Sequence, residues 1–286
     1  MHIFSNTRWI EQFNYPYERF EEIPEAVFTT INQDLDRVQS KEPVVSILIA
    51  AWNEETNILR CLASLSKMKS KYPFEIIVID NNSKDRTKDT LDKLHVKHLF
   101  QEIQGCGPAR QIGQEQALGN YILLADADCL YPDCWVDKMV DVLSKPGVVC
   151  VYGRYSFIAE KRYPRWKLFL LEKMKDVIAE VRHFKRPFLN AYGISMGYVK
   201  EYGLKVGYVM YKIWGDDGRL AFDLMPYGKI KQVKSDAARP WTSPRTLDRD
   251  GSFGKALKAR LGKEVKRVFS MFKPMAPHDT KTSTND

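Results

Sequence analysis

Two aspartates at the end of an apolar run are the residues of this chain best suited to do chemistry. Residues 121–125 (YILLA) follow the turn-forming pair Gly119-Asn120, and such a run is typical of a buried strand. Asp126 and Asp128 come next. Because a buried carboxylate is costly without a compensating partner, two of them at one strand end predict a divalent cation. Oxygen ligands of this kind favour Mg²⁺ or Mn²⁺. The alternative is that both aspartates only form a turn or cap a helix.

Other polar residues occupy comparable positions. Asp80 closes a second apolar run, either to bind a ligand or to form an Asx turn. Arg110 falls in the first turn of a predicted helix, where free amides and the helix dipole already favour an anion. There it could clamp a diphosphate, or it could be a solvated surface arginine. Asp216 and Asp217 open a later helix, for which aspartate is also a good N-cap.

The elements that must position these residues alternate between strand and helix. We predict strands at residues 44–51, 75–79, 96–100, 121–129 and 148–157, and helices at 54–67, 84–91, 108–118 and 132–143. This alternation predicts an α/β fold with a doubly wound, mostly parallel sheet. Ligands of such sheets bind at the carboxyl ends of the strands, which is where Asp80, Asp126 and Asp128 fall.

Around this region the chain divides into three parts. We predict an N-terminal extension over residues 1–42, strapped across a single main domain over residues 43–245, and a tail over residues 246–286. In the main domain, residues 164–184 and 216–225 form helices, residues 230–233 form a strand, and residues 235–250 form a loop. In the tail, the pattern of residues 253–272 predicts a basic amphipathic helix, and the residues after Pro274 are predicted to be disordered.

Bulk composition excludes some classes of protein. A hydrophobic content of 44% and a charged content of 28% are typical of a globular protein. No apolar stretch is long enough to span a bilayer, and residues 1–10 lack the pattern of a signal peptide. Five cysteines without zinc-ligand spacing favour reduced thiols in the cytoplasm. The net charge of +8 indicates an anionic partner, and no nucleic-acid-binding motif is present.

Five polar elements, taken in order, resemble those of the family 2 inverting glycosyltransferases of the GT-A (Rossmann-like) fold. They are residues 52–55 (WNEE), 80–83 (DNNS), 107–110 (GPAR), 126–128 (DAD) and 215–217 (GDD). The resemblance covers residues 43–245. It implies a metal-dependent enzyme that moves one sugar from a nucleotide-diphosphate sugar, with a UDP-sugar as the expected donor, to a hydroxyl group of the acceptor.

The resemblance also implies a role for each matching residue. Asp126 and Asp128 would hold Mg²⁺ or Mn²⁺, Asp217 would be the general base, and Asp216 would support it. The donor would be bound by Ala51, Trp52, Glu54, Asp80, Arg110, Asp126, Asp128 and Arg245. Residues 190–196 would lie on the acceptor side, or would only be tightly packed. Trp214 would stack on a sugar, or belong to the core.

Several residues depart from the pattern of the family. Ala50 replaces a proline, Trp52 a tyrosine, Asn81 a frequent second acid, and Asp216 the usual glutamate. The glutamine-and-tryptophan motif of processive synthases is absent, which favours transfer of a single sugar.

Basic residues interleaved with aromatic ones indicate that the protein binds its acceptor at a membrane surface. The helix at residues 253–272 and the patch at residues 161–166 (KRYPRW) suit an anionic membrane surface. The alternative is a packed helix with a solvated basic face. We therefore expect a glycan or lipid-linked acceptor in cell-surface polysaccharide or glycolipid assembly, and a peripheral location on the inner face of the cell membrane.

Two other functions remain open. A sugar nucleotidyltransferase would carry a glycine-rich basic loop after the first strand, where this chain has the acidic residues 50–55 (AAWNEE). A non-catalytic, basic membrane-binding module would leave Asp126, Asp128 and Asp217 without a role.

Overall fold

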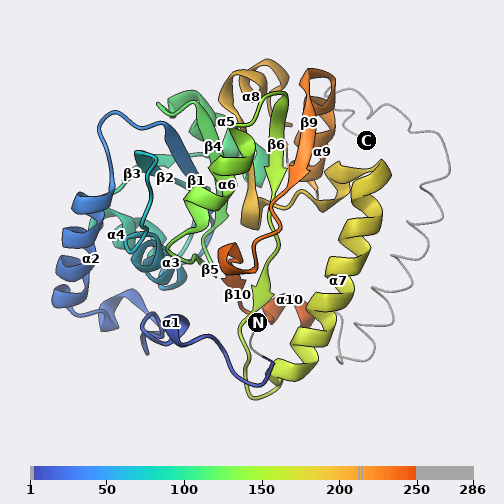
Figure 1. Ribbon diagram of the computed structural model, residues 1–286. Helices are drawn as coiled ribbons and strands as arrows, with labels where there is room; N and C mark the ends of the chain where they lie inside the picture. The colour runs from blue at the N-terminus through green and yellow to red at the C-terminus, as the bar shows by residue number, and fades with distance from the viewer. Residues whose placement is uncertain (1–2, 212, 214, 249–286) are drawn as a thin grey trace, which may run out of the picture.

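A seven-stranded sheet organises the computed structural model, which describes residues 3–211, 213 and 215–248 (Figure 1). The strand order is β3-β2-β1-β4-β8-β6-β9. All neighbours pair in parallel except β8, which runs antiparallel to both β4 and β6. The strands are β1 Val45–Ala51, β2 Phe74–Asp80, β3 Lys97–Phe100, β4 Tyr121–Asp126, β6 Val148–Tyr152, β8 Met196–Val199 and β9 Lys229–Gln232. This confirms the predicted α/β fold with a mostly parallel sheet.

The register of the central strands brings the predicted polar residues to one edge. Ala51 pairs with Asp80 across β1 and β2, and Ala50 pairs with Asp126 across β1 and β4. The carboxyl ends of the three strands therefore lie side by side, as parallel pairing requires.

Helices cover both faces of the sheet. On one face, α2 (Glu25–Val38), α3 (Asn57–Leu65), α4 (Thr87–Asp92) and α6 (Trp135–Leu143) pack on the side chains of Ile47, Ile49 and Leu123. On the other face, α5 (Cys106–Gln116) and α9 (Asp216–Leu224) pack on Leu48 and Leu124. Helix α8 (Lys200–Val206) follows β8.

The N-terminal extension contributes to the main core. It contains α1 (Arg8–Glu11), the short 3-10 helix η1 (Phe20–Glu22) and α2. Phe13, Phe28 and Leu35 are buried in the same cluster as Ile58 and Leu62 of α3. The extension is therefore held against the main domain by apolar packing.

A small second sheet and a long helix complete the fold. The sheet consists of β5 (Cys129–Leu130), β10 (Trp241–Thr242) and β7 (Ser156–Phe157), with β10 in the middle. Helix α7 (Arg165–Lys185) runs along one side of the molecule (Figure 1). Its buried face carries an ion pair: Arg165 Nη2 donates to Glu172 Oε2 over 2.8 Å, and both side chains are 1% exposed. The short helix α10 (Arg245–Asp248) packs Leu247 against this region.

Several helices begin at a residue other than the one predicted. Helix α3 begins at Asn57 rather than at residue 54, because Asn53 is in the left-handed region (φ 55°) and its side chain accepts from Lys84 N instead of capping a helix. Helix α5 begins two residues before Pro108, and α6 begins at Trp135 rather than at Pro132.

Two other predictions of secondary structure were wrong. The strand predicted at residues 148–157 is interrupted after Tyr152, so that β7 joins the second sheet. The loop predicted at residues 235–250 contains β10 and α10, whose few residues are too short to show a periodicity in the sequence.

Some predictions fall outside the described residues. Trp214 and the basic helix at residues 253–272 are among them. Within the described part of the chain, no helix combines the length and the apolar character needed to cross a membrane.

Candidate active site

Arg110 of α5 gathers three predicted acids around one guanidinium. Its Nη1 donates to Asp216 Oδ2 over 2.8 Å and also to the Asp217 carboxylate, while Nη2 lies 3.6 Å from Asp126 Oδ1. The side chain of Arg110 is 3% exposed. It is thus a buried cation held by carboxylates from β4 and α9, which lie far apart in the sequence. The structure brings four predicted site residues together here.

The backbone at Gly193, in the 3-10 helix η3 (Gly193–Ser195), completes this cluster. Gly193 N donates to Asp217 Oδ2 over 2.8 Å. A Cβ atom at this position would lie 2.8 Å from Arg110 Cζ and 3.2 Å from Asp126 Oδ1. Only glycine lets the backbone approach so closely. The structure therefore shows tight packing at Gly193, against the site, and the acceptor side of residues 190–196 stays a prediction.

Burial shifts the pKa values of two carboxyl groups toward neutrality. The pKa of Asp217 is raised to about 6, mainly by burial, with Arg110 opposing the shift and Asp216 adding to it. The pKa of Asp126 is raised to about 7, again mainly by burial, against Arg110 and with Asp128. Carboxyl groups with pKa values near the working pH are suited to exchange protons or to bind a cation.

Asp216 does not cap its helix, although aspartate at a helix start often does. The N-cap of α9 is Gly215, whose φ of 84° places it in the left-handed region. Asp216 is 7% exposed, and its carboxylate is directed to Arg110. The N-capping alternative for Asp216 is therefore wrong, because the buried guanidinium binds its carboxylate instead.

Two further predicted acids, Glu54 and Asp128, form a second group around Arg245. Arg245 Nη2 lies 2.7 Å from Asp128 Oδ2 and 2.6 Å from Glu54 Oε1. Burial raises the pKa of Glu54, and Arg245 opposes that shift. Arg245 was expected on the donor diphosphate; here it bridges the loop after β1 to the aspartate that follows β4.

The residues after β4 fit a hard divalent cation. Asp126, Asp128 and Cys129 each offer a ligand atom, and these atoms all lie within 4.8 Å of one another. The Cys129 thiol donates to Asp128 Oδ1 over 3.2 Å, and burial raises its pKa well above the ordinary value. Because Mg²⁺ and Mn²⁺ prefer oxygen to sulfur, the two carboxylates are the donor set that suits them.

The other predicted donor residues lie at the ends of β1 and β2. Trp52, directly after Ala51, is 50% exposed. Asp80 is 5% exposed and accepts from Ser83 N over 3.1 Å, so its Asx-turn reading holds. Asn81, which departs from the family pattern, accepts from Gly105 N over 2.7 Å. It thereby orders the loop that leads into α5.

Sequence reasoning missed two groups that position Asp126 and Asp217. The Tyr131 hydroxyl accepts from Asp126 N over 2.8 Å and donates to Ile194 O over 3.1 Å. It therefore links the DAD segment to the segment that carries the Gly193 amide. Neither contact has a signal in residue type or spacing, since both arise from tertiary packing.

Comparison with known proteins agrees with this geometry. The family model described as glycosyl transferase family 2 matches residues 46–201, more than half of the chain. The chain belongs to this family. The prediction made from the five polar elements is therefore confirmed.

Two curated relatives resemble the chain over part of its length. Glycosyltransferase AglE of Haloferax volcanii is 33% identical over 155 residues, which are 48% of this chain and 49% of that protein. Chondroitin synthase of Escherichia coli is 25% identical over 171 residues, which are 56% of this chain and 25% of that protein. The chain thus spans about half the length, or less, of these curated relatives.

Solved structures share the fold. The mannosyltransferase PcManGT from Pyrobaculum calidifontis, in complex with GDP-Man and Mn²⁺, has a TM-score of 0.54 and 15% identity, covering 86% of this chain and 80% of that one. TarS 1-349 of S. aureus, in complex with UDP-GlcNAc, has a TM-score of 0.54 and 18% identity, covering 70% of this chain and 58% of that one.

Proposed function

We propose that this family 2 protein transfers one sugar from a nucleotide-diphosphate sugar to an acceptor hydroxyl, with inversion at the anomeric carbon. One observation carries the proposal: Asp217 lies beside the DAD segment, joined to Asp126 through Arg110. An inverting transfer needs this pairing of a general base with a place for the departing diphosphate.

We propose a separate role in the transfer for each residue of the cluster. Asp217 takes the proton of the acceptor hydroxyl while the hydroxyl oxygen attacks the anomeric carbon and the bond to the diphosphate breaks. The Gly193 amide and Arg110 hold the Asp217 carboxylate in place. Asp126 and Asp128 would hold the divalent cation, which supplies charge neutralisation for the departing diphosphate when bound. Arg110 already binds Asp126, Asp216 and Asp217. We therefore propose that Arg110 positions these acids rather than the donor diphosphate.

A nucleotide-sugar screen tests the donor. We propose a UDP-sugar with Mn²⁺ or Mg²⁺, because Trp52 offers a half-exposed ring and Asp80 a buried carboxylate at neighbouring strand ends. Thermal shifts should appear with uridine nucleotide sugars and Mn²⁺, and should be smaller without the metal. Larger shifts with guanosine nucleotides, or shifts independent of the metal, would contradict this assignment.

Substitution of the base tests the transfer step. Asp217→Asn should reduce transfer by roughly 10²–10⁴-fold, because the proton of the acceptor then has no base. Donor affinity, measured by calorimetry, should stay within a few fold. Asp223→Asn, in the same helix, is the matched control and should transfer at the rate of the wild type. Loss of donor binding together with transfer in Asp217→Asn would refute the role as base.

The exposed face of α7 supports the proposal of a membrane-associated acceptor. This face, which we call the α7 stripe, consists of large apolar side chains at helical spacing that are 46–86% exposed: Trp166, Leu170, Val177, Val181 and Phe184. The three acidic side chains of the helix are instead paired, Glu172 with Arg165, Asp176 with Arg239, and Glu180 with Lys234. The helix also carries several lysines and arginines, so an anionic bilayer complements both its basic composition and its apolar stripe.

We therefore propose a peripheral protein on the cytoplasmic face of the cell membrane, acting on a glycan or lipid-linked acceptor. The patch predicted at residues 161–166 is only partly available, since Tyr163 and Arg165 are buried. The full chain should float with vesicles that contain anionic lipid and not with neutral vesicles. Two variants test the two regions independently. The double substitution Leu170→Glu with Phe184→Glu disrupts the α7 stripe, and truncation after Asp250 removes the tail. Equal flotation of the full chain and both variants would remove the membrane proposal.

A further inference from the structure

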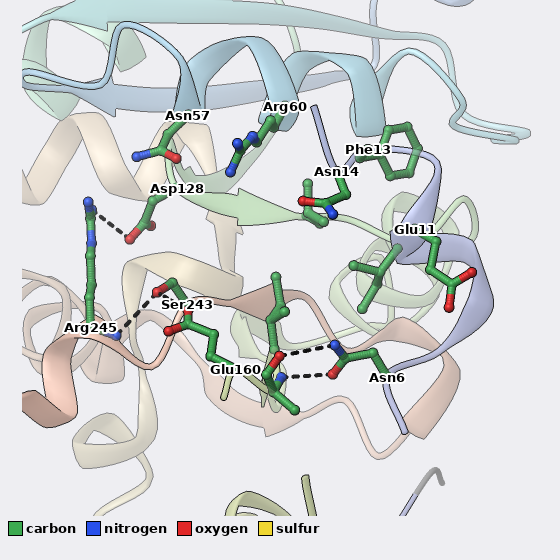
Figure 2. A pocket seen from close by; sticks show the side chains of 14 residues that line it. Asn6, Glu11, Phe13, Asn14, Asn57, Arg60, Asp128, Glu160, Ser243 and Arg245 are labelled. Atoms are coloured by element: carbon green, nitrogen blue, oxygen red, sulfur yellow. Dashed lines mark hydrogen bonds and ion pairs between the residues drawn. The ribbon is translucent and has the colours of Figure 1, made fainter. Parts of the chain in front are cut away.

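A pocket of about 450 Å³ lies beside Asp128, on the side of the N-terminal extension (Figure 2). Its walls come from the extension, from α3, from β5 and from the segments at residues 158–160 and 243–245. The extension lies outside residues 46–201, the segment shared with the family. The pocket is therefore built partly from residues that the family model does not match.

Arg60 of α3 is the notable charge in this pocket. One of its Nη atoms donates to the backbone oxygen of Tyr15, while its Nε is buried and has no hydrogen-bond partner. It forms no ion pair with any residue that the structure describes. Arg110, Arg165 and Arg245 all bind carboxylates. A partly buried guanidinium without a counter-ion is costly, and an anionic ligand would relieve that cost.

The rest of the lining suits a sugar. The Asn14 amide has no protein partner among the described residues, and it faces the pocket together with the Asn57 amide, which donates to Glu54 Oε2 over 2.6 Å. Phe13 and Leu130 supply an apolar wall of the kind that packs on a sugar face. Glu11 and Glu160, both exposed, also line the pocket and can accept from sugar hydroxyls.

Charge at the mouth of the pocket does not exclude an anion. Asp128 is paired with Arg245, 2.7 Å away, which also binds Glu54, and the two other carboxylates of the lining, Glu11 and Glu160, are exposed to solvent that screens their charge. An acidic group that enters would meet the N–H groups of Arg60 that Tyr15 does not occupy, and these can form charge-assisted hydrogen bonds with its oxygens.

We propose that this pocket binds the anionic group, a carboxylate or a phosphate, of an acidic sugar substrate, with Arg60 as the residue that selects the charge. The proposal rests on the proposed sugar transfer, because the pocket adjoins Asp128. The acidic sugar could arrive on the acceptor or as the sugar of the donor. In both cases the recognition is the same, a charge-assisted hydrogen bond to Arg60.

Direct binding of simple sugars tests the pocket without metal, donor or turnover. Calorimetry should show glucuronate and glucose 6-phosphate binding to the full chain about tenfold or more tightly than glucose, as hydrogen bonds to a charged group predict. Arg60→Met should abolish this preference, and Arg60→Lys should keep part of it. Arg86→Met is the matched control, since Arg86 also joins the extension to the main domain, through Glu21. It should retain the preference.

Two results would overturn the proposal: equal affinity of the wild type for glucose and for the acidic sugars, or an unchanged preference in a folded Arg60→Met. Failure of the sugar-transfer proposal would instead show as normal acidic-sugar binding with no transfer. Competition of glucuronate with UDP-glucuronate but not with UDP-glucose would assign the pocket to the donor sugar. Simultaneous binding with both would assign it to the acceptor.

Discussion

Replacement of Gly193 by alanine should separate catalysis from donor binding. The added Cβ would lie 2.8 Å from Arg110 Cζ, whereas a normal carbon contact is about 3.5 Å or more, so the guanidinium must move. It cannot move alone, because it binds Asp216 and Asp217. Displacement of a catalytic group by about 1 Å costs on the order of 10²-fold in rate. We therefore expect Gly193→Ala to lower the transfer rate about a hundredfold.

The same substitution has a predictable effect on stability. Overpacking a buried position costs about 1–3 kcal/mol, and the cost here should be at the upper end because the displaced group is a buried ion pair. Melting curves should therefore shift down by several degrees. Donor affinity measured without metal should change little, since Trp52 and Asp80 lie at the ends of other strands.

A nearby glycine offers the control for this experiment. Gly218 follows Asp217 in α9, and a Cβ atom there would meet only Phe188 O, at 3.3 Å. Gly218→Ala should therefore keep most of the activity. The assay is release of nucleotide from the donor in the presence of acceptor, with calorimetry for the donor. Wild-type turnover by a Gly193→Ala protein of unchanged melting temperature would refute the proposed arrangement of Arg110 and Asp217.

Four further outcomes are expected. The pKa of Asp217 is about 6, and the carboxyl group must be deprotonated to act as a base. At saturating Mn²⁺, kcat/KM should therefore be constant above pH 7 and fall tenfold per pH unit well below pH 6. A flat profile down to pH 5 would contradict this. Asp128→Ala should weaken metal-dependent nucleotide binding, and unchanged affinity by calorimetry would count against its role as a ligand. In the absence of nucleotide, Arg245→Gln should strengthen Mn²⁺ binding by a few fold, because the substitution removes a cation that is paired with Asp128 in a partly exposed site. Weaker Mn²⁺ binding would show that Arg245 supports the metal. Glu172→Gln should destabilise the fold by about 3–5 kcal/mol, because Arg165 remains buried without its counter-charge; a melting temperature equal to that of the wild type would contradict this.

The sequence predicted the parts of the site that follow from local patterns. Apolar runs located β1, β2 and β4, and parallel pairing then placed Asp80 and Asp126 at one edge without further information. Helix starts were less predictable: Asn53 looks like a cap, but its conformation depends on the loop it contacts after β2. Arg60 resembles any polar residue of an amphipathic helix, and its lack of a counter-ion among the described residues is visible only once the extension is packed against it.

The single reversed strand of the main sheet has a consequence for how this enzyme can vary. Because β8 runs opposite to β4, with Met196 beside Leu124, the chain enters β8 at the edge where β4 ends. A parallel strand would have put its entry loop at the opposite edge. The reversal thus lets the Gly193 amide, from the stretch before β8, reach Asp217, the proposed base. Changes in that short stretch would alter the surroundings of the Asp217 carboxylate without changing the pairing of the sheet.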